Sequence, residues 1–418
     1  MRIGRARFGT SFAVVAVMAI VASGCHFNNW YQYRGYGDGT ASNDDSHNLT
    51  TAQATSLTEQ AKAKIGTVPS LDTNTLFQSG PVEFEGVIYV NGEDGSLHAY
   101  DENGLKSLWD AKTSGKTSLS NPPASVATTY PPGKPIDNVI IAPSTIDNTV
   151  YAFHLDGSLA WSTNLGGQGG TININSSALN EVGGGITLIG AGTRVFTLDS
   201  TTGNIDRRST SFTGSVTTPV LGGFRPSGVG TGNLVWFGTG AGHVKALDDA
   251  SLTQVWDWKN GSGNKIGAIT TDGDNENLLF AGTNGGQVVA LDGSTGIQRG
   301  VPMNNGISMP CACGQSGELA ASGQVLFMTG TDLKVRSFLI TTFNEIAETA
   351  TAPGPSYLTV AGGVLYGTWP LRLMDAQFLT ILSKPTFAGW AANSSAEAVP
   401  ADGALWVVGT DGFIHELT

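Results

Sequence analysis

Residues 277–299 read NLLFAGTNGGQVVALDGSTGIQR, which is an apolar segment, a Gly-containing turn and a second apolar segment. In the second segment Val288 and Ala290 are two residues apart, so their side chains point to one face of a strand, whereas Leu291 points to the other face. The Asn-Gly pair between the segments tolerates the positive φ angles of a tight hairpin turn. This stretch therefore predicts a β-hairpin with both faces buried.

The same pattern recurs along most of the chain. Seven further copies begin at Val87, Asn138, Gly185, Leu234, Gln324, Gly363 and Ala404. Equivalent apolar residues of successive first strands, such as Tyr89, Ile141 and Leu188, stand about 40 to 50 residues apart. That period, with several short strands, is typical of a propeller blade and not of a helical solenoid. The sequence therefore predicts an all-β fold, an eight-bladed β-propeller of four-stranded antiparallel blades.

The eighth copy, residues 404–418, ends after its second strand. A blade without its outer strands exposes a sheet edge, and closed rings avoid such edges. We therefore expect strands from the segment before Val87 to close the ring.

One segment between the first two copies lacks the strand pattern. Residues 112–137 are rich in Pro, which sheets confine to edges, bulges and turns. The prolines are Pro122, Pro123, Pro131, Pro132 and Pro135. We expect this segment to form a long surface loop.

Composition excludes several classes of protein. Charged residues make up 13% of the chain, about half the usual share, and 57 of the 418 residues are Gly. These values argue against coiled coils and helical bundles, while 40% apolar residues argue against a disordered chain. The net charge of −12, without a cluster of Lys and Arg, argues against nucleic-acid binding.

The N-terminus has the organisation of an export signal. A basic head precedes an apolar core at residues 12–22, which is too short to span a membrane as a helix, and small residues precede Cys25. The segment resembles a bacterial lipoprotein signal, which implies cleavage after residue 24 and a lipid on Cys25. An ordinary secretory signal with an incidental Cys25, or an uncleaved anchor, is the alternative. We expect a signal peptide at residues 1–24, a lead-in and tether at 25–75, part of which is available to close the ring, and the propeller at 76–418.

The repeats resemble those of quinoprotein-type (PQQ-like) β-propellers over most of residues 75–418. The shared motifs are the apolar strand, the Gly turn, the second strand ending in Asp, and the following Thr-Gly and Leu-Trp pairs. In that family a Trp near the end of each repeat docks one blade on the next, and the resemblance assigns this role to Trp109, Trp161 and Trp256. Arg or Gln stands near this position in the third and fifth units, so we expect an incomplete set of docking contacts.

Two further cysteines occur in the tripeptide Cys311-Ala312-Cys313. An oxidising compartment permits a strained disulfide between Cys311 and Cys313, and two free thiols in a tight loop are the alternative. Quinoprotein dehydrogenases bind pyrroloquinoline quinone (PQQ) with Ca²⁺ and often carry a disulfide between two adjacent cysteines. In this chain Ala312 separates the two cysteines, so the pattern differs. The chain has no haem attachment motif, and no motif supplies metal-ligand or catalytic carboxylates. We therefore predict no catalytic residue and no cofactor.

Other polar residues are weaker candidates for a site. Asp272, Asp274 and Glu276 alternate as at the start of a calcium loop, but the later ligands are missing, so an acidic hairpin loop is the stronger interpretation and a metal site the weaker one. His98 and His415 share one repeat position in neighbouring units, and no third ligand recurs with them, so we interpret them as packing residues. Four aspartates recur at one repeat position and are expected in turns: Asp101, Asp199, Asp248 and Asp292.

These features predict a lipoprotein of the cell envelope that faces the periplasm or the exterior and serves as a protein-interaction scaffold. It resembles in class the BamB-type propeller lipoproteins of outer-membrane assembly. The expected partners are other cell-envelope proteins and, through lipid at Cys25, the membrane; we expect a monomeric propeller and no nucleic acid. One alternative is a PQQ-dependent alcohol or sugar dehydrogenase that holds Ca²⁺. The other is a module for glycans or cell-wall polymer, with Trp30, Tyr31 and Tyr33 as stacking surfaces.

Overall fold

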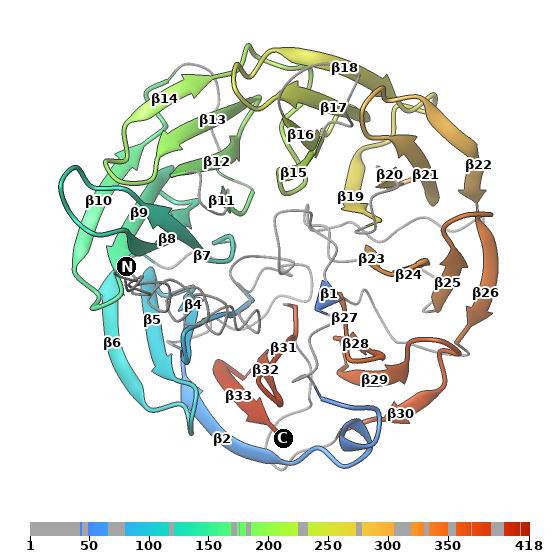
Figure 1. Cartoon of the computed structure of the whole chain (residues 1–418), viewed down its shortest axis with the longest axis horizontal. Coiled ribbons are helices and arrows are strands. Elements are labelled where there is room, and N and C mark those ends of the chain that lie inside the picture. The colour runs from blue at the N-terminus through green and yellow to red at the C-terminus, as the bar shows by residue number, and fades with distance from the viewer. Residues whose placement is uncertain are drawn as a thin grey trace, which may run out of the picture.

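The chain forms a closed ring of eight sheets in the computed structural model (Figure 1). The described residues are 42–43, 49–65, 80–116, 121–168, 174, 176–180, 185–224, 233–272, 278–304, 319–329, 334–349, 357–368, 370–385, 397–409 and 411–418. Among them the only helix is one short 3₁₀ turn, η1 (Gln53–Thr55). The predicted eight-bladed all-β propeller is therefore confirmed.

Blades 1 to 4 each have four antiparallel strands, which are numbered from the inside of the ring outward. Blade 1 consists of β3 (Val82–Phe84), β4 (Val87–Asn91), β5 (Ser96–Asp101) and β6 (Ser107–Lys112). Blade 2 consists of β7 (Ser125–Thr129), β8 (Asp137–Ser144), β9 (Thr149–His154) and β10 (Leu159–Asn164). Blade 3 consists of β11 (Leu179–Asn180), β12 (Ile186–Ala191), β13 (Arg194–Asp199) and β14 (Ile205–Arg208). Blade 4 consists of β15 (Leu221–Phe224), β16 (Asn233–Gly238), β17 (His243–Asp248) and β18 (Gln254–Lys259).

Blades 5 to 8 follow the same plan, with two strands added from the N-terminal part of the chain. Blade 5 consists of β19 (Ile266–Thr271), β20 (Leu278–Thr283), β21 (Gln287–Asp292) and β22 (Gln298–Asn304). Blade 6 consists of β23 (Leu319–Ser322), β24 (Val325–Thr329), β25 (Val335–Leu339) and β26 (Asn344–Glu348). Blade 7 consists of β1 (Ser42–Asn43), β27 (Leu358–Ala361), β28 (Val364–Gly367), β29 (Arg372–Asp375) and β30 (Ile381–Ser383). Blade 8 consists of β31 (Val399–Ala401), β32 (Ala404–Val408), β33 (Phe413–Leu417) and β2 (Glu59–Lys64).

The outer strand of blade 8 comes from the other end of the chain. β2 pairs antiparallel with β33, so the residues before Val87 fill the place that the eighth repeat leaves empty. β1 pairs in parallel with the inner edge of β27, which makes the sheet of blade 7 five-stranded. No pattern in the sequence indicated this short strand.

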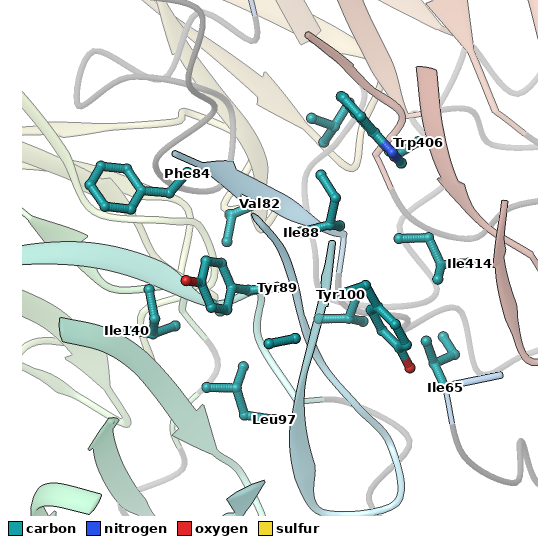
Figure 2. Packing of buried hydrophobic residues seen from close by; sticks show 14 of the residues in the cluster. Ile65, Val82, Phe84, Ile88, Tyr89, Leu97, Tyr100, Ile140, Trp406 and Ile414 are labelled. Carbon is teal, nitrogen blue, oxygen red and sulfur yellow. The ribbon is translucent and has the colours of Figure 1, made fainter. Parts of the chain in front are cut away.

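The repeats align across each blade as the spacing predicted. In blade 1, Tyr89 of β4 lies opposite Ala99 of β5, and Ala99 lies opposite Trp109 of β6. The two faces of the blade pack in opposite directions: Figure 2 shows Tyr89 toward Ile140 of blade 2 and Tyr100 on the side of Ile414 of blade 8, all within one buried cluster. Full burial of such side chains stabilises the fold by roughly 1.5–3 kcal/mol each.

The structure corrects the prediction of a long surface loop at residues 112–137. Residues 125–129 form β7, the inner strand of blade 2, which pairs with β8. Its sequence, SVATT, is rich in β-branched residues, and the prolines stand before and after it. Between β7 and β8 the exposed loop covers residues 130–136.

The ring has two faces. Face A carries the turns that join the first strand of a blade to the second and the third to the fourth, for example residues 85–86 and 102–106 of blade 1. Face B carries the hairpins between the second and third strands, such as residues 92–95, and the connections between blades. Within the described ranges there is no helix long and apolar enough to cross a membrane.

The three tryptophans assigned by the resemblance lie against the following blade. The indole N–H groups of Trp109, Trp161 and Trp256 donate to carbonyl oxygens in the next blade's turn between its third and fourth strands, at distances of 2.9, 2.8 and 2.8 Å. Each ring covers a Gly of that turn, where a Cβ would lie closer than 3.0 Å to the indole: Gly157, Gly203 and Gly296. These glycines have positive φ angles and leave room for the ring.

Other residues occupy the docking position where Trp is absent. Arg207 of blade 3 donates from its guanidinium to the backbone oxygens of Asp249 and Ala250 in blade 4. At the junction of blades 8 and 1, Ala61 stands in the Trp position, and Glu416 beside it accepts a hydrogen bond from the Gly104 N–H at 3.1 Å. The contact between blades is thus kept while its chemistry changes.

We expect Trp256→Ala to lower the free energy of unfolding by about 3–5 kcal/mol, because it removes a buried aromatic ring and its hydrogen bond. Trp256→Phe keeps most of the packing and should cost less, whereas Val255→Ala at the exposed neighbour should change stability by no more than about 0.5 kcal/mol. Urea unfolding followed by circular dichroism measures all three. Equal midpoints for Trp256→Ala and Val255→Ala would contradict a docking role for Trp256.

Candidate functional site

Exposed apolar side chains gather on face A. Among the described residues, some of these side chains stand in the turns of face A, and others stand at the first or second residue of an outer strand, where that strand begins at face A. They are Leu108, Tyr130, Ile136, Leu159, Val255, Ile297, Phe378 and Ile381. On face B the one exposed large apolar side chain of the described hairpins is Ile146, and Val301 and Ile346 lie further along the outer strands β22 and β26. Exposed apolar groups that gather on one side mark interaction surfaces. Face A is therefore the candidate binding face.

The most prominent element of this face is the loop at residues 130–136, YPPGKPI, between β7 and β8. Pro132 and Gly133 occupy the centre of a turn in which the Lys134 N–H donates to the Pro131 oxygen at 3.1 Å. Gly133 has φ +69°, so this is the Pro-Gly pattern of a type II turn. Ile136 beside the turn is 65% exposed.

The loop is held in place by blade 3. The Tyr130 N–H donates to the Thr201 hydroxyl at 2.9 Å, and the Tyr130 ring stacks so close to Gly185 that a Cβ there would lie 3.0 Å from it. Three prolines and these contacts hold the loop in one conformation in the free protein. Preorganised loops lose little conformational entropy on binding, so the loop is suited to dock in an apolar pocket of another protein.

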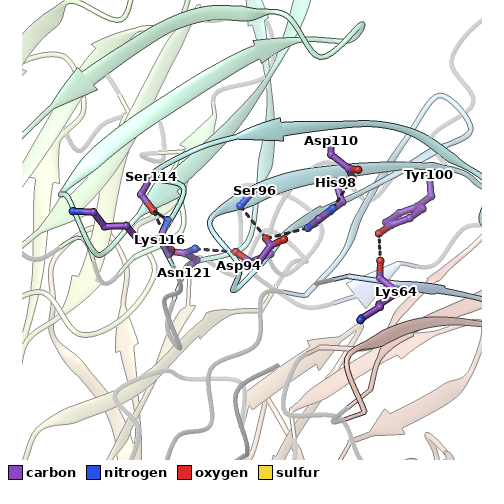
Figure 3. Close-up of polar contacts among 10 residues, drawn as sticks. Lys64, Asp94, Ser96, His98, Tyr100, Asp110, Ser114, Lys116 and Asn121 are labelled. Atoms are coloured by element: carbon purple, nitrogen blue, oxygen red, sulfur yellow. Dashed lines mark hydrogen bonds and ion pairs between the residues drawn. The ribbon is translucent and has the colours of Figure 1, made fainter. Parts of the chain in front are cut away.

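Blade 1 carries a histidine between two carboxylates near face B (Figure 3). His98 Nδ1 lies 2.6 Å from Asp110 Oδ1, and His98 Nε2 lies 3.2 Å from Asp94 Oδ1. Burial of the ring lowers its pKa, but the hydrogen bonds and charges of Asp94 and Asp110 outweigh this effect, so the pKa of His98 is raised. Since carboxylates only accept, both ring nitrogens donate in the protonated ring.

Blade 8 repeats this arrangement with residues from both ends of the chain. His415 Nδ1 lies 3.0 Å from Glu59 Oε2, and Nε2 lies 3.1 Å from Asp411 Oδ1. Blade 4 places Lys245 at the same repeat position, where it pairs with Asp257. In these three blades the position holds a basic side chain that joins the third strand of the blade to its fourth, and the histidines act in packing.

A second polar group lies where blades 1 and 2 meet on face B. The amide of Asn91 donates to the oxygens of Pro122 and Pro143 at 2.8 Å each, and the amide of Asn121 donates to the Gly92 oxygen at 3.0 Å. Next to this network, Glu93 is 8% exposed, and its Oε2 has no hydrogen bond to any described residue. Burial raises the pKa of Glu93 to about 7.

Three carboxylates converge on face A between blades 1 and 8. Oxygens of Glu83, Glu102 and Asp402 lie within 4.8 Å of one another, which is close enough to hold a cation. Burial, followed by the charges of Asp402 and Asp101, raises the pKa of Glu102. No sequence motif pointed to this group, because Glu83 and Glu102 of blade 1 meet Asp402 of blade 8 only when the ring closes.

The recurring aspartates occupy turns, as their spacing predicted. Asp199 Oδ1 accepts hydrogen bonds from the N–H groups of Thr201 and Thr202, at 2.9 and 2.8 Å. Asp101, Asp248 and Asp292 likewise accept from backbone N–H groups two or three residues later. These carboxylates serve the turns of separate blades.

Several residues singled out from the sequence lie outside the described residues: Cys25, Trp30, Tyr31, Tyr33, Asp274, Glu276, Cys311 and Cys313. Their roles stay predictions. Asp272 is described and buried, and its carboxylate accepts a hydrogen bond from the Leu278 N–H at 3.3 Å across its own loop.

Comparison with known proteins shows that the chain is similar to PQQ-like propellers. Residues 55–257 match the family described as outer membrane protein assembly factor BamB. BamB from Moraxella catarrhalis is similar in structure, with a TM-score of 0.59 and 16% identity over 87% of this chain and 98% of that chain. The quinohemoprotein alcohol dehydrogenase ADHIIG from Pseudomonas putida HK5 has a TM-score of 0.68 and 12% identity over 96% of this chain and 81% of its own.

The quinohemoprotein alcohol dehydrogenase from Comamonas testosteroni has a TM-score of 0.65 and 13% identity over 96% of this chain and 82% of its own. No curated protein is significantly similar in sequence. At such identities the solved structures establish the fold alone. Together with the family match, they confirm the resemblance to PQQ-like propellers that the repeats predicted.

We expect Glu93→Gln to stabilise the fold at pH 8 by about 2 kcal/mol, because it removes a charge that burial disfavours. A raised pKa means that the folded state holds the proton more tightly, so the wild type should lose stability as the pH rises from about 4.5 to 7. The variant should lack this part of the pH dependence. Glu85→Gln, at an exposed position of the same blade, is the matched control. Parallel pH profiles of wild type and Glu93→Gln in urea unfolding would contradict the burial argument.

Proposed function

We propose that this protein is a lipid-anchored scaffold of the cell envelope that binds other envelope proteins through face A of its propeller. The observation that carries the proposal is the number of exposed apolar side chains at that face, which include Tyr130 and Ile136 of the fixed loop at residues 130–136. The match of residues 55–257 to an outer membrane protein assembly factor supports both the envelope location and protein partners. The lipid on Cys25 would hold the propeller at the membrane surface.

The chemistry of the loop indicates how a partner is recognised. Tyr130 and Ile136 offer apolar surface at either end of the turn, and Lys134 at its tip adds one positive charge. A pocket of matching shape with an acidic rim would bury both side chains. Burying the exposed part of an Ile side chain is worth up to roughly 1.5–3 kcal/mol, or about tenfold to a hundredfold in affinity.

We therefore expect Ile136→Ser to weaken partner binding by at least about tenfold without changing stability, since Ile136 is already exposed in the free protein. Ile146→Ser on face B is the matched control and should leave binding unchanged. A photocrosslinking amino acid at each position in living cells would identify the partner, and titration of that purified partner would measure the affinities. Equal crosslinking yields and equal affinities at the two positions would contradict a docking role for face A.

A lipid on Cys25 should be visible in the mass of the intact protein. We expect protein extracted from membranes to lack residues 1–24 and to carry added acyl chains, and Cys25→Ser to release the propeller into the soluble fraction. One acyl chain binds a membrane only weakly, so several chains are expected. Wild-type protein that is soluble and begins at another residue would contradict the anchor.

We further propose that the scaffold works without a bound quinone. The chain has no haem attachment motif, and its recurring aspartates are engaged in turns of separate blades. PQQ with Ca²⁺ should therefore produce neither a bound-quinone absorption spectrum nor dye reduction with alcohols or aldose sugars. Turnover that is lost in Cys311→Ser and Cys313→Ser would favour the dehydrogenase instead.

A further inference from the structure

The N-terminal arm, by which we mean the described residues 42–43 and 49–58 before β2, begins inside the ring. β1 pairs with the inner edge of β27, the first strand of blade 7, and also contacts β23 of blade 6 (Figure 1). Ser42 is 9% exposed at this position. First strands line the middle of a propeller, so a strand added on their inner side lies nearer the axis than any blade.

The direction of β1 is fixed by its pairing. β1 runs parallel to β27, with Ser42 opposite Val360 and Asn43 opposite Ala361. β27 ends at Ala361, where the turn to β28 lies on face A. The chain therefore enters β1 from the side of face B and leaves it toward face A.

The next described residues, 49–58, lead to the outside of the ring. Leu49, Ala54 and Leu57 are buried in the core that blades 7 and 8 share. The Thr58 N–H then donates to the oxygen of Thr418 at 2.9 Å, at the face A end of β33, where β2 begins. Thus β1 runs along the middle of the ring from face B toward face A, residues 49–57 pack on blades 7 and 8, and β2 closes the ring.

We propose that this arm threads the ring and thereby orients the propeller on the membrane, with face B toward the lipid and face A toward partner proteins. The orientation rests on the proposed lipid anchor at Cys25, whereas the threading does not. Because the chain enters β1 from face B, the face with few exposed apolar groups lies on the tether side. The apolar face A is then free for protein partners.

The length of the chain between the lipid and β1 limits how far the ring can lie from the membrane. Cys25 and Ser42 are 17 residues apart in sequence, so the lipid lies at most about 60 Å from β1.

The threading is tested with a cysteine pair in the full chain. Ser42→Cys and Val360→Cys, in a background with Cys25, Cys311 and Cys313 replaced by Ser, place two thiols on directly paired residues of adjacent strands. Such residues are about 5 Å apart between Cα atoms, within disulfide range. We expect mild oxidation to join them in the folded protein. Ser42→Cys with Gly222→Cys, on the inner strand of blade 4, should stay reduced.

The orientation is tested with two matched lysine positions in lipidated protein bound to phosphatidylethanolamine–phosphatidylglycerol vesicles. Lys116→Cys lies on the exposed face B connection after β6, and Lys134→Cys lies on the exposed face A loop. With Cys311 and Cys313 replaced by Ser, a donor dye on either thiol reports energy transfer to an acceptor lipid. We expect higher transfer from position 116 than from position 134.

Each result decides a separate claim. A reduced 42–360 pair, or equal oxidation of the 42–222 control, overturns the threading. Equal transfer from both dyes on vesicle-bound protein, or higher transfer from position 134, overturns the orientation while the lipid anchor stands. Protein that fails to float with the vesicles overturns the anchor and with it the orientation, and the disulfide result then decides the threading alone.

Discussion

Closure of the ring between β2 and β33 is the interaction on which the other contacts depend. Each blade buries both of its faces against neighbours, so an open ring would leave blades 1 and 8 each with an apolar face in water. The closing pair of His415 and Glu59 spans 356 positions of the sequence. Closing a loop of that length costs about 5 kcal/mol of chain entropy, plus a constant. A few buried side chains of blade 8, such as Trp406 and Ile414, offset that cost at roughly 1.5–3 kcal/mol each.

The repeat pattern predicted the ring but did not identify its closing strand. Tyr89, Ala99 and Trp109 stand at fixed places in the repeat, and these places become lateral neighbours in the blade, so periodicity was sufficient to predict the fold. β2 reads EQAKAK, and Glu, Gln, Ala and Lys favour helices over strands. Only the unpaired edge of β33 makes this segment a strand. Tertiary pairing outweighs the local helix preference here. The sequence showed that the eighth blade needs a further strand, but it did not show which residues form that strand.

The candidate binding face was harder to predict, because exposure depends on which turns share a side of the ring. The prolines of residues 112–137 indicated a surface loop, but the β-branched run at 125–129 forms the inner strand that the second blade needs. The contacts that hold Tyr130 against Thr201 and Gly185 join different repeats, so no local pattern records them. The docking tryptophans and the Arg that replaces Trp in the third unit were visible in the repeat, whereas the hydrogen bonds that Arg207 and Glu416 make to the next blade were not. The cysteines outside the described residues stay predictions.

The arm and the closing strand belong to one segment, and this has a mechanical consequence. The chain reaches the inner edge of blade 7 as β1 and the outer edge of blade 8 as β2, and residues 44–58 separate the two strands. If the arm is tethered to a membrane, a pull on it reaches β1 and the inner edge of β27 before it reaches the outer edge of β33. The strand that closes the ring is therefore separated from the tether by a pairing in another blade.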